Sequence, residues 1–298
     1  MSKTAIVVLN YNDFSTTENY INVISRYEVL DKIVVVDNHS TDESFRILKQ
    51  LNNDKIDVIQ TDCNHGYAKG NNYGLNHLLH LESKYDYVII SNPDIIVSED
   101  SIAKLIHEMQ HRSRIFAITG EIYTLNGSRI GGFRTKLPTL TMLFLESSVV
   151  LRKIFWILFK YGRRYQSDEI DCSGVLLKAE SLPGCFFMAN FDIFERLGFF
   201  DEQTFLYSEE DILFSKSKKA GYNSYVLRDT KIIHAEGTTI KKNISAWKKR
   251  ERIRERSNTI YMKSCLNTSN QVIGLYKVWN RLFSTERFLN MKLRTKYY

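Results

Sequence analysis

The sequence predicts an α/β fold in which a mostly parallel, doubly wound sheet is flanked by helices and followed by a C-terminal helical extension. Three runs of apolar, mainly β-branched residues, at 5–9, 33–36 and 88–90, have the composition of strands buried on both faces. Segments with helical periodicity separate these runs. Strands that alternate with helices are typical of a parallel sheet with helices on both sides.

The other elements follow from periodicity and from the residues that begin helices. Ser40–Glu43 puts acidic residues in a first helical turn and therefore predicts a helix start. Segment 137–165 combines apolar, aromatic and basic residues, and is either a buried helix or an interfacial segment. The remaining predicted elements are helix 15–27, a helix from Ser40–Glu43 to about 51, strand 56–60, and helices 71–81 and 100–110.

The composition is that of a globular intracellular protein. The 298 residues are 43% hydrophobic and 25% charged, as expected for one large or two small domains. The four cysteines form no CxxC pair and no zinc-binding spacing, which indicates free thiols in a reducing cytosol. No signal-peptide pattern occurs at the N-terminus, and no apolar run approaches the roughly 20 residues that span a bilayer. We therefore expect a cytoplasmic protein.

The charge of the chain changes sign at about residue 240. Residues 241–298 hold 15 Lys and Arg and 3 Asp and Glu, a net charge of +12, which leaves −5 for residues 1–240 because the total is +7. We expect a main α/β domain over 1–240 and a basic helical extension over 241–298. Such an extension attracts anionic lipid, nucleic acid or an acidic partner.

The basic extension contains a predicted amphipathic helix. Its apolar residues follow i, i+4, i+7, i+8 spacing, and Lys277 and Arg281 lie elsewhere on the helix. The four apolar residues are Leu275, Trp279, Leu282 and Phe283. Two interpretations remain open: the helix lies on a membrane surface, or it packs on the main domain or on a second copy of the chain in a homodimer.

Short polar side chains follow each of the three predicted strands. Asn10 follows the first strand, Asp37 the second, and Asn92 and Asp94 the third. Ligands of open α/β sheets bind beyond the carboxyl ends of the strands. One such residue is often only a turn former, but three groups at one edge of the sheet favour a ligand site.

Six ordered motifs built around these positions resemble the family 2 glycosyltransferases, which have the GT-A fold. The resemblance covers about residues 4–240, and the most similar subgroup contains rhamnosyltransferase-like and capsule-building enzymes. The motifs are Val7–Asn12 with Val34–Asp42, Asn64–Gly74, Ser91–Asp94, Gly184–Met188, Leu197–Glu202 leading to Tyr207–Asp211, and Lys219–Tyr222 with Ile233–Thr238.

The resemblance implies a donor site in the first half of the chain. Asp37 is expected to accept the imide N–H of uracil or thymine and so to select a UDP- or dTDP-linked sugar. The glycines of the 64–74 loop let the backbone approach a ligand, and the loop opens a helix whose N-terminus favours phosphate. A helix cap at Asp37 and an ordinary turn at 64–74 are the alternatives. The other donor-binding candidates are Asn10, Gly66, Gly70, Asn71, Asn92 and Asp94.

The resemblance also implies a metal site. Asp94 and His234 match the metal-ligand positions of the family, and a carboxylate with an imidazole suits Mn²⁺ or Mg²⁺. The ion would neutralise the charge that grows on the diphosphate leaving group. Asn92 stands where a full DXD motif has its first acid, which lowers the number of ligands from the protein.

The general base is expected within the acidic segment Glu209–Asp211. Inversion requires a carboxylate that takes the proton of the acceptor hydroxyl. An ungapped match puts Glu210 where the family has its Asp base, with Asp211 as the second candidate. The sequence departs from the family at Ile212, where a second acid is usual.

The implied activity is inverting transfer of a sugar to a hydroxyl of a saccharide or lipid-linked saccharide in cell-surface polysaccharide synthesis, at the inner face of the cell membrane. A sugar-nucleotide nucleotidyltransferase is one alternative, but residues 10–16 lack its Gly-rich basic signature. A non-catalytic sugar-nucleotide or nucleic-acid binding module is another. No nucleic-acid-binding motif occurs, and the absence of a P-loop and of GxGxxG argues against ATPase and NAD-dependent activity.

Overall fold

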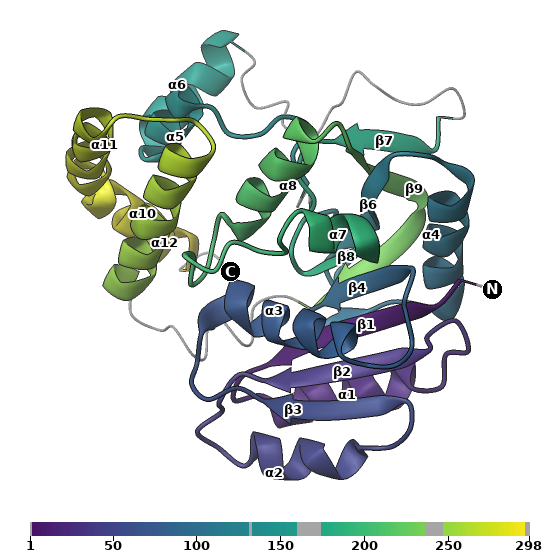
Figure 1. Ribbon diagram of the computed structural model, residues 1–298. Coiled ribbons are helices and arrows are strands. Elements are labelled where there is room, and N and C mark those ends of the chain that lie inside the picture. The colour runs from purple at the N-terminus through teal and green to yellow at the C-terminus, as the bar shows by residue number, and fades with distance from the viewer. Residues whose placement is uncertain (1, 131–132, 160–173, 236–246, 296–298) are drawn as a thin grey trace.

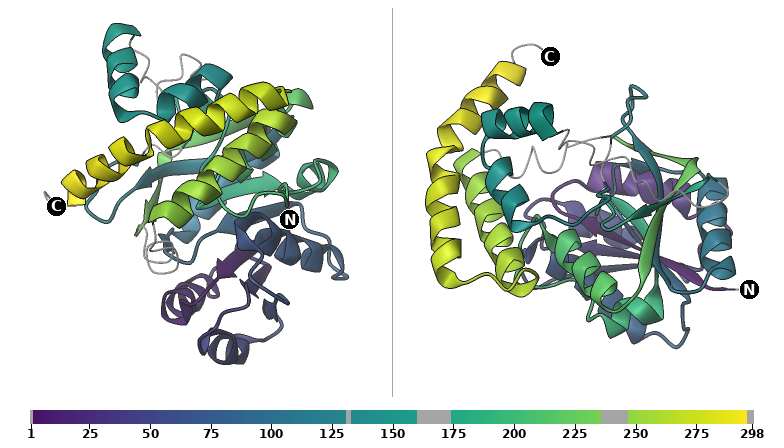
Figure 2. Two further views of the ribbon diagram at one scale, coloured as in Figure 1. Left: turned by 90° about the vertical axis from the view of Figure 1, so that its left-hand side faces the viewer. Right: turned by 90° about the horizontal axis from the view of Figure 1, so that it is seen from above.

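The computed structural model has a central sheet with helices on both faces, and its C-terminal helices stand together at one side of the sheet (Figures 1 and 2). The structure describes residues 2–130, 133–159, 174–235 and 247–295. Within these ranges, none of the helices combines the length and the apolar character needed to cross a membrane.

The first half of the sheet is parallel. Its strands lie in the order β3-β2-β1-β4, and every pairing in this group is parallel. Their residues are largely buried because helices cover both faces, which explains the continuous apolar runs in the sequence. The strands are β1 (Thr4–Asn10), β2 (Lys32–Asp37), β3 (Ile56–Gln60) and β4 (Tyr87–Ser91).

Beyond β4 the sheet is mixed. β8 (Phe186–Asn190) is antiparallel to β4 and to β6 (Ile115–Tyr123), whereas β9 (Asn223–His234) is parallel to β6. β9 also pairs in the antiparallel sense with β5 (Ile95–Ile96) and β7 (Leu176–Ala179). The predicted α/β class is confirmed, and the predicted parallel pairing holds for the first four strands. Because β8 runs against β4, the start of β8 lies beside the end of β4.

Two hydrophobic cores lie on the two faces of the sheet. The helices on one face contribute residues such as Ile21 and Ile102 to the first core, and those on the other face contribute Leu75 and Phe194 to the second. The first face carries α1 (Phe14–Ile24), α2 (Ser44–Leu48) with a 3₁₀ turn (Lys49–Leu51), and α4 (Glu99–His111); the second carries α3 (Gly66–Leu79), α7 (Phe191–Arg196) and α8 (Glu209–Lys219).

Two helices begin at other residues than predicted. α3 begins at Gly66 rather than at 71, because its glycines suit close packing on the sheet as well as a loop. α2 begins at Ser44 rather than within Ser40–Glu43, because Ser40 forms a turn in which its N–H donates to Asp37. The local sequence permits either structure in both places, and packing selects one.

Segment 137–165 and the C-terminal extension form one helical layer. Segment 137–165 contains α5 (Leu140–Glu146) and α6 (Val149–Phe159), and its residues 160–165 fall outside the described ranges. A third hydrophobic cluster joins Leu143 of α5 and Ile212 of α8 to the C-terminal helices. The extension therefore packs on the main domain. Its helices are α10 (Trp247–Ser264), α11 (Asn270–Leu282) and α12 (Ser284–Thr295).

The predicted apolar face of α11 is only partly buried. Trp279 points inward and donates its indole N–H to the Phe144 carbonyl at 3.0 Å, whereas Leu275 and Leu282 are 61% and 70% exposed. The buried face instead contains Ile273 and Tyr276. The helix has apolar residues on two faces, and spacing alone does not tell which face meets the core.

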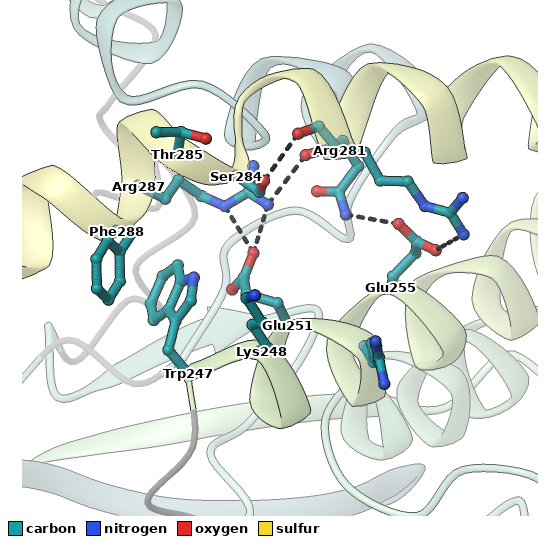
Figure 3. Close-up of a pocket in the computed structure, with 11 residues that line it drawn as sticks. Trp247, Lys248, Glu251, Glu255, Arg281, Ser284, Thr285, Arg287 and Phe288 are labelled. Carbon is teal, nitrogen blue, oxygen red and sulfur yellow. Dashed lines mark hydrogen bonds and ion pairs between the residues drawn. The ribbon is translucent and has the colours of Figure 1, made fainter.

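A buried ion pair holds the C-terminal helices together (Figure 3). Arg287 of α12 donates from Nε to Oε2 of Glu251 on α10 at 2.8 Å, and from Nη2 to the Asn280 carbonyl of α11 at 3.1 Å. Glu255, one turn along α10, accepts from Asn280 Nδ2 at 3.0 Å and forms an ion pair with Arg281 at 3.2 Å. Three helices are thereby joined through polar contacts as well as through the third cluster.

Candidate active site

Asp37 lies at the end of β2 with its carboxylate fully buried. Its Oδ1 accepts hydrogen bonds from Asn10 Nδ2 at 2.8 Å and from Ser40 Oγ at 2.6 Å. Its Oδ2 accepts from the Ser40 N–H and from Gln60 Nε2, both at 3.0 Å. A carboxylate offers about four acceptor positions, so this network occupies all of them.

This network bears on the predicted contact between Asp37 and a pyrimidine base. An imide N–H reaches the carboxylate only where one of the four internal donors gives up its bond. Ser40 and Gln60 are half-buried, whereas Asn10 is fully buried and also accepts from the Thr17 hydroxyl at 2.8 Å. Gln60 and Ser40 are therefore the donors that can yield. Gln60 was not among the donor-site candidates from the sequence. Its place at the end of strand 56–60 is the feature that could have suggested it.

The glycines of the 64–74 loop contact protein. Gly66 has φ +80°, and a Cβ there would lie 2.1 Å from the Phe205 carbonyl oxygen. A Cβ on Gly70 would lie 2.7 Å from Cδ1 of Leu9. Asn71 is buried, and its Oδ1 has no hydrogen-bond partner among the described residues. The amide oxygen of Asn71 is thus the open acceptor of this loop.

Asp94 and His234 meet where β5 pairs with β9. Asp94 immediately precedes β5, whose first residue pairs with His234, and Nε2 of His234 lies 3.1 Å from Oδ1 of Asp94. Burial opposes protonation of this histidine, but hydrogen bonds to Asp94 and Cys185 outweigh burial and raise the pKa of His234 to about 10. The structure therefore brings together the two residues predicted to hold a metal, here as an ion pair.

The geometry of the Asp94–His234 pair fits a divalent cation in place of the shared proton. Two neighbouring ligands of an octahedral ion, each about 2.1 Å from the metal, lie about 3.0 Å apart. The measured separation of Nε2 and Oδ1 is 3.1 Å. A carboxylate and an imidazole are ligands that Mn²⁺ and Mg²⁺ accept. Asn92 lies close by, and its N–H donates to the Cys185 carbonyl at 2.8 Å.

The three acidic residues that begin α8 have different surroundings. Glu209 is buried, and burial together with the charge of Glu210 raises the pKa of Glu209 well above its usual range. Asp211 forms an ion pair with Arg134, whose Nε lies 3.1 Å from Oδ1. Burial raises the pKa of Glu210 to about 7, with Asp211 adding to the shift and Arg134 opposing it. Glu210 is therefore the carboxylate that titrates near neutral pH.

Two consecutive residues before β8 connect the acidic cluster with the Asp94–His234 pair. Gly184 lies against Glu210 and accepts a hydrogen bond on its carbonyl from the Tyr67 hydroxyl at 2.5 Å. Cys185 bonds to His234. Residues of both clusters line one cavity of about 630 Å³ between the main domain and the C-terminal helices. Glu210 and His234 thus face the same space, whereas Asp94 is not among the residues that line it.

We predict that Gly184→Ala lowers turnover by roughly 10²-fold, the effect of displacing a reacting group by about 1 Å. A Cβ at this position would lie 2.1 Å from Oε1 of Glu210, so Glu210 must move. Steady-state kinetics tests this, with Gly274→Ala as the control because a Cβ there meets nothing within 4 Å. Equal turnover in both variants would contradict the placement of Glu210 over Gly184.

The sequence matches the protein family described as Glycosyl transferase family 2 over residues 5–166, more than half of the chain. This range contains the strand ends that carry Asn10, Asp37 and Asp94. The chain belongs to glycosyl transferase family 2. This result favours a glycosyltransferase over the nucleotidyltransferase considered from the sequence.

Two curated proteins illustrate the relatives of this glycosyltransferase. A low-salt glycan biosynthesis hexosyltransferase, Agl10 of Haloferax volcanii, is 25% identical over 265 residues, which are 87% of this chain and 77% of the relative. A poly-β-1,6-N-acetyl-D-glucosamine synthase of Staphylococcus aureus is 29% identical over 124 residues, 41% of this chain. The matched part spans only 29% of the length of that synthase.

Solved structures of other glycosyltransferases share the fold of this enzyme. GalNAc-T7 with UDP, GalNAc and Mn²⁺ aligns with a TM-score of 0.58 at 15% identity, over 78% of this chain and 44% of that one. The mannosyltransferase PcManGT of Pyrobaculum calidifontis with GDP-Man and Mn²⁺ aligns with a TM-score of 0.53 at 13% identity, over 95% and 84%. The predicted GT-A fold is confirmed.

Several residues of this glycosyltransferase site escaped the sequence-based candidates. Gly184 lay within a recognised motif, but nothing in the sequence shows that it borders Glu210. Tyr67 also lay within a motif, where its hydroxyl had no predicted partner. Arg134 has no local signal, because its partner Asp211 is distant in the sequence. The contacts of these residues depend on how the strands and helices are assembled.

Proposed function

We propose that this enzyme transfers a sugar with inversion, using Glu210 to take the proton of the acceptor hydroxyl. The observation that carries the proposal is that Gly184 and Cys185, two adjacent residues, touch Glu210 and His234 in one cavity. The acceptor hydroxyl and the bond to be broken must lie close together in a single displacement. A site with a base at one end and a metal pair at the other meets that requirement.

Glu210 is a better candidate for the base than Asp211. A base works best when its pKa lies near the working pH, and the pKa of Glu210 is about 7. The Asp211 carboxylate is instead engaged in an ion pair with Arg134, whose Nε lies 3.1 Å from Oδ1. Glu209 is buried beside them, and burial raises its pKa well above its usual range.

Asp94 and His234 are proposed to hold Mn²⁺ or Mg²⁺ through one oxygen and one ring nitrogen. When bound, the ion supplies positive charge to the leaving diphosphate. Asn92 presents an amide at the same edge of the sheet, and its backbone is held by Cys185. Loss of the proton shared by Asp94 and His234 would accompany binding of the metal, since His234 must be neutral to act as a ligand.

The donor is proposed to be a UDP- or dTDP-linked sugar, with its base near Asp37. When the base binds, its imide N–H would donate to Asp37 in place of the hydrogen bond that Gln60 or Ser40 now donates. Thermal shift with UDP-, dTDP- and GDP-linked sugars, with and without Mn²⁺, tests this. We expect stabilisation by a pyrimidine donor only, and larger with metal; stabilisation by a GDP-sugar alone would overturn the choice of base.

The acceptor is proposed to be a saccharide or lipid-linked saccharide used in cell-surface polysaccharide synthesis. The cavity beside Glu210 takes its walls from the main domain and from the C-terminal helices, which contribute Arg254, Asn258 and Tyr276. The names of the relatives agree with such a role, since one acts in glycan biosynthesis and another makes a polysaccharide.

We further propose that the C-terminal helices contact an anionic membrane surface. α11 exposes Leu275, Val278 and Leu282 at i, i+3, i+7 spacing, and residues 241–298 carry a net charge of +12. Apolar side chains beside basic ones are typical of helices that lie in the interface of a membrane. Each Lys or Arg near an anionic surface contributes about 1 kcal/mol, and salt screens this attraction.

We therefore expect the full-length protein to co-sediment with anionic vesicles at low salt, and much less at high salt or with neutral vesicles. Replacing Leu275, Val278 and Leu282 by Ser should release the protein. Val23→Ser is the control, because Val23 is an apolar residue on α1 that is also more than half exposed. If the full-length protein stays in solution with anionic vesicles at low salt, the membrane contact is wrong.

A further inference from the structure

The turn before the proposed base has an unfavourable backbone. Tyr207 has φ 74° and Ser208 has φ 64°, two consecutive left-handed residues without a glycine. Side chains other than glycine are strained in this region, and a bulky one such as Tyr especially so. α8 begins at the next residue, so the conformation of this turn fixes where Glu210 points. Something outside the turn must hold it.

α10 contacts Leu206, Tyr207 and Ser208, the three residues of the turn that precedes α8. The Ser257 hydroxyl donates to the Leu206 carbonyl at 2.8 Å. The guanidinium of Arg254 lies 5.2 Å from the centre of the Tyr207 ring. The Ser208 hydroxyl donates to Oδ1 of Asn258 at 3.0 Å.

Asn258 is itself fixed by a second helix. Its Nδ2 donates to the Tyr276 hydroxyl of α11 at 2.7 Å. This bond orients the amide so that Oδ1 faces Ser208. Tyr276 is buried and packs edge-on against Phe144 of α5, with ring centres 5.4 Å apart. The contact at Ser208 is thus backed by a rigid core rather than by solvent-exposed side chains.

The first turn of α8 is held from the same side by an apolar contact. Ile212 is fully buried in the cluster that contains Tyr261 and Met262 of α10 and Ile273 of α11. The sequence departs from the usual family motif at this position, which has an acid there. An apolar residue is required here because the C-terminal helices cover it.

We propose that the C-terminal helices position the catalytic base, with Ser257 and Asn258 as positioning residues that hold the strained turn before Glu210. The inference rests on the proposed role of Glu210. It gives residues 247–282 a part in catalysis that is separate from any contact with a membrane. The donor is proposed to bind at the other end of the site, near Asp37, so its affinity should not depend on these residues.

The test compares Asn258→Ala and Ser208→Ala, singly and together, with Arg256→Ala as the control on the exposed side of α10. We expect each single variant to lower kcat about tenfold or more while the Kd of a UDP- or dTDP-sugar with Mn²⁺ stays unchanged. The double variant should lose little more than either single one, because both remove the same hydrogen bond. Arg256→Ala should match the wild type.

Two further readouts separate positioning from a general loss of structure. Asn258→Asp keeps an acceptor for Ser208 and can accept from Tyr276 as its hydroxyl turns, so it should restore most of kcat. In Asn258→Ala the rising limb of the pH profile of kcat/KM should move to lower pH, because a looser turn exposes Glu210 to water and burial is what raises its pKa.

The outcomes distinguish this proposal from the proposed function. If Glu210→Gln abolishes turnover but Asn258→Ala and Ser208→Ala leave kcat and the pH profile unchanged, the positioning role fails alone. If Glu210→Gln retains wild-type turnover, the proposed base is wrong. If Asn258→Ala does not fold, Ser208→Ala and Ser257→Ala decide, because each removes only one hydroxyl that holds this turn.

Discussion

Replacing Glu210 by Gln is expected to lower turnover by roughly 10²–10⁴-fold, the usual contribution of a general base. Gln has the same shape but does not take a proton, so the acceptor hydroxyl remains a weak nucleophile. Donor affinity should be unchanged, because Glu210 lies at the acceptor side of the cavity, against Gly184. Steady-state kinetics gives turnover, and calorimetric titration of the donor gives affinity.

The pH profile provides an independent check on Glu210. The active form of a base is the deprotonated one, and the pKa of Glu210 is about 7. In the wild type, kcat/KM should therefore rise about tenfold per pH unit below 7 and level off above it. This limb should be absent in Glu210→Gln.

Asp211→Asn is the matched comparison for Glu210→Gln. It should cost less turnover, because the Asp211 carboxylate is engaged in an ion pair with Arg134. A larger loss in Asp211→Asn than in Glu210→Gln would assign the base to Asp211 and show that the match to the family is displaced by one residue.

Replacing Asp94 by Ala is expected to abolish the metal dependence of donor binding without unfolding the protein. Loss of a residue that supports a metal ligand lowers metal affinity roughly 10–100-fold. The candidate metal site has two protein ligands, so the loss of one should lower metal affinity by at least that factor. Calorimetric titration of UDP or dTDP with and without Mn²⁺ measures this. The wild type should bind more tightly with metal, and the variant should bind equally in both conditions.

Two variants control for the Asp94 result. His234→Gln removes the other ligand and should reproduce the loss of metal dependence. Asp100→Ala removes an exposed carboxylate on α4 that forms an ion pair with Lys104, and should behave like the wild type. If Asp94→Ala binds UDP with Mn²⁺ as tightly as the wild type does, the metal assignment is wrong.

The sequence by itself determined the first half of the sheet and the edge on which the site lies. Buried parallel strands need continuous apolar runs, and the residues after these runs must share one edge because the strands point the same way. Asn10, Asp37 and Asp94 were found in this way, and the family resemblance added His234 and Glu210. The structure brings Asp94 and His234 within 3.1 Å of each other.

The sequence did not determine which neighbours each side chain packs against or pairs with. The first residue of α3 and the inward face of α11 depend on what packs against them, since glycines suit either a loop or a close-packed helix and α11 has apolar residues on two faces. Likewise, the ungapped family match favours Glu210 as the base but leaves its neighbour Asp211 as the second candidate. Arg134 distinguishes them because it forms an ion pair with Asp211, 3.1 Å away, whereas its effect on Glu210 is through its charge.

Only the tertiary structure showed that the basic extension belongs to the site. Composition indicated a tail with a positive charge, which suits many partners. The contacts of Ser208 with Asn258 and of Ile212 with the third cluster join segments that are distant along the chain. Periodicity and helix caps report on neighbours within a few residues, whereas these contacts depend on the path of the whole chain.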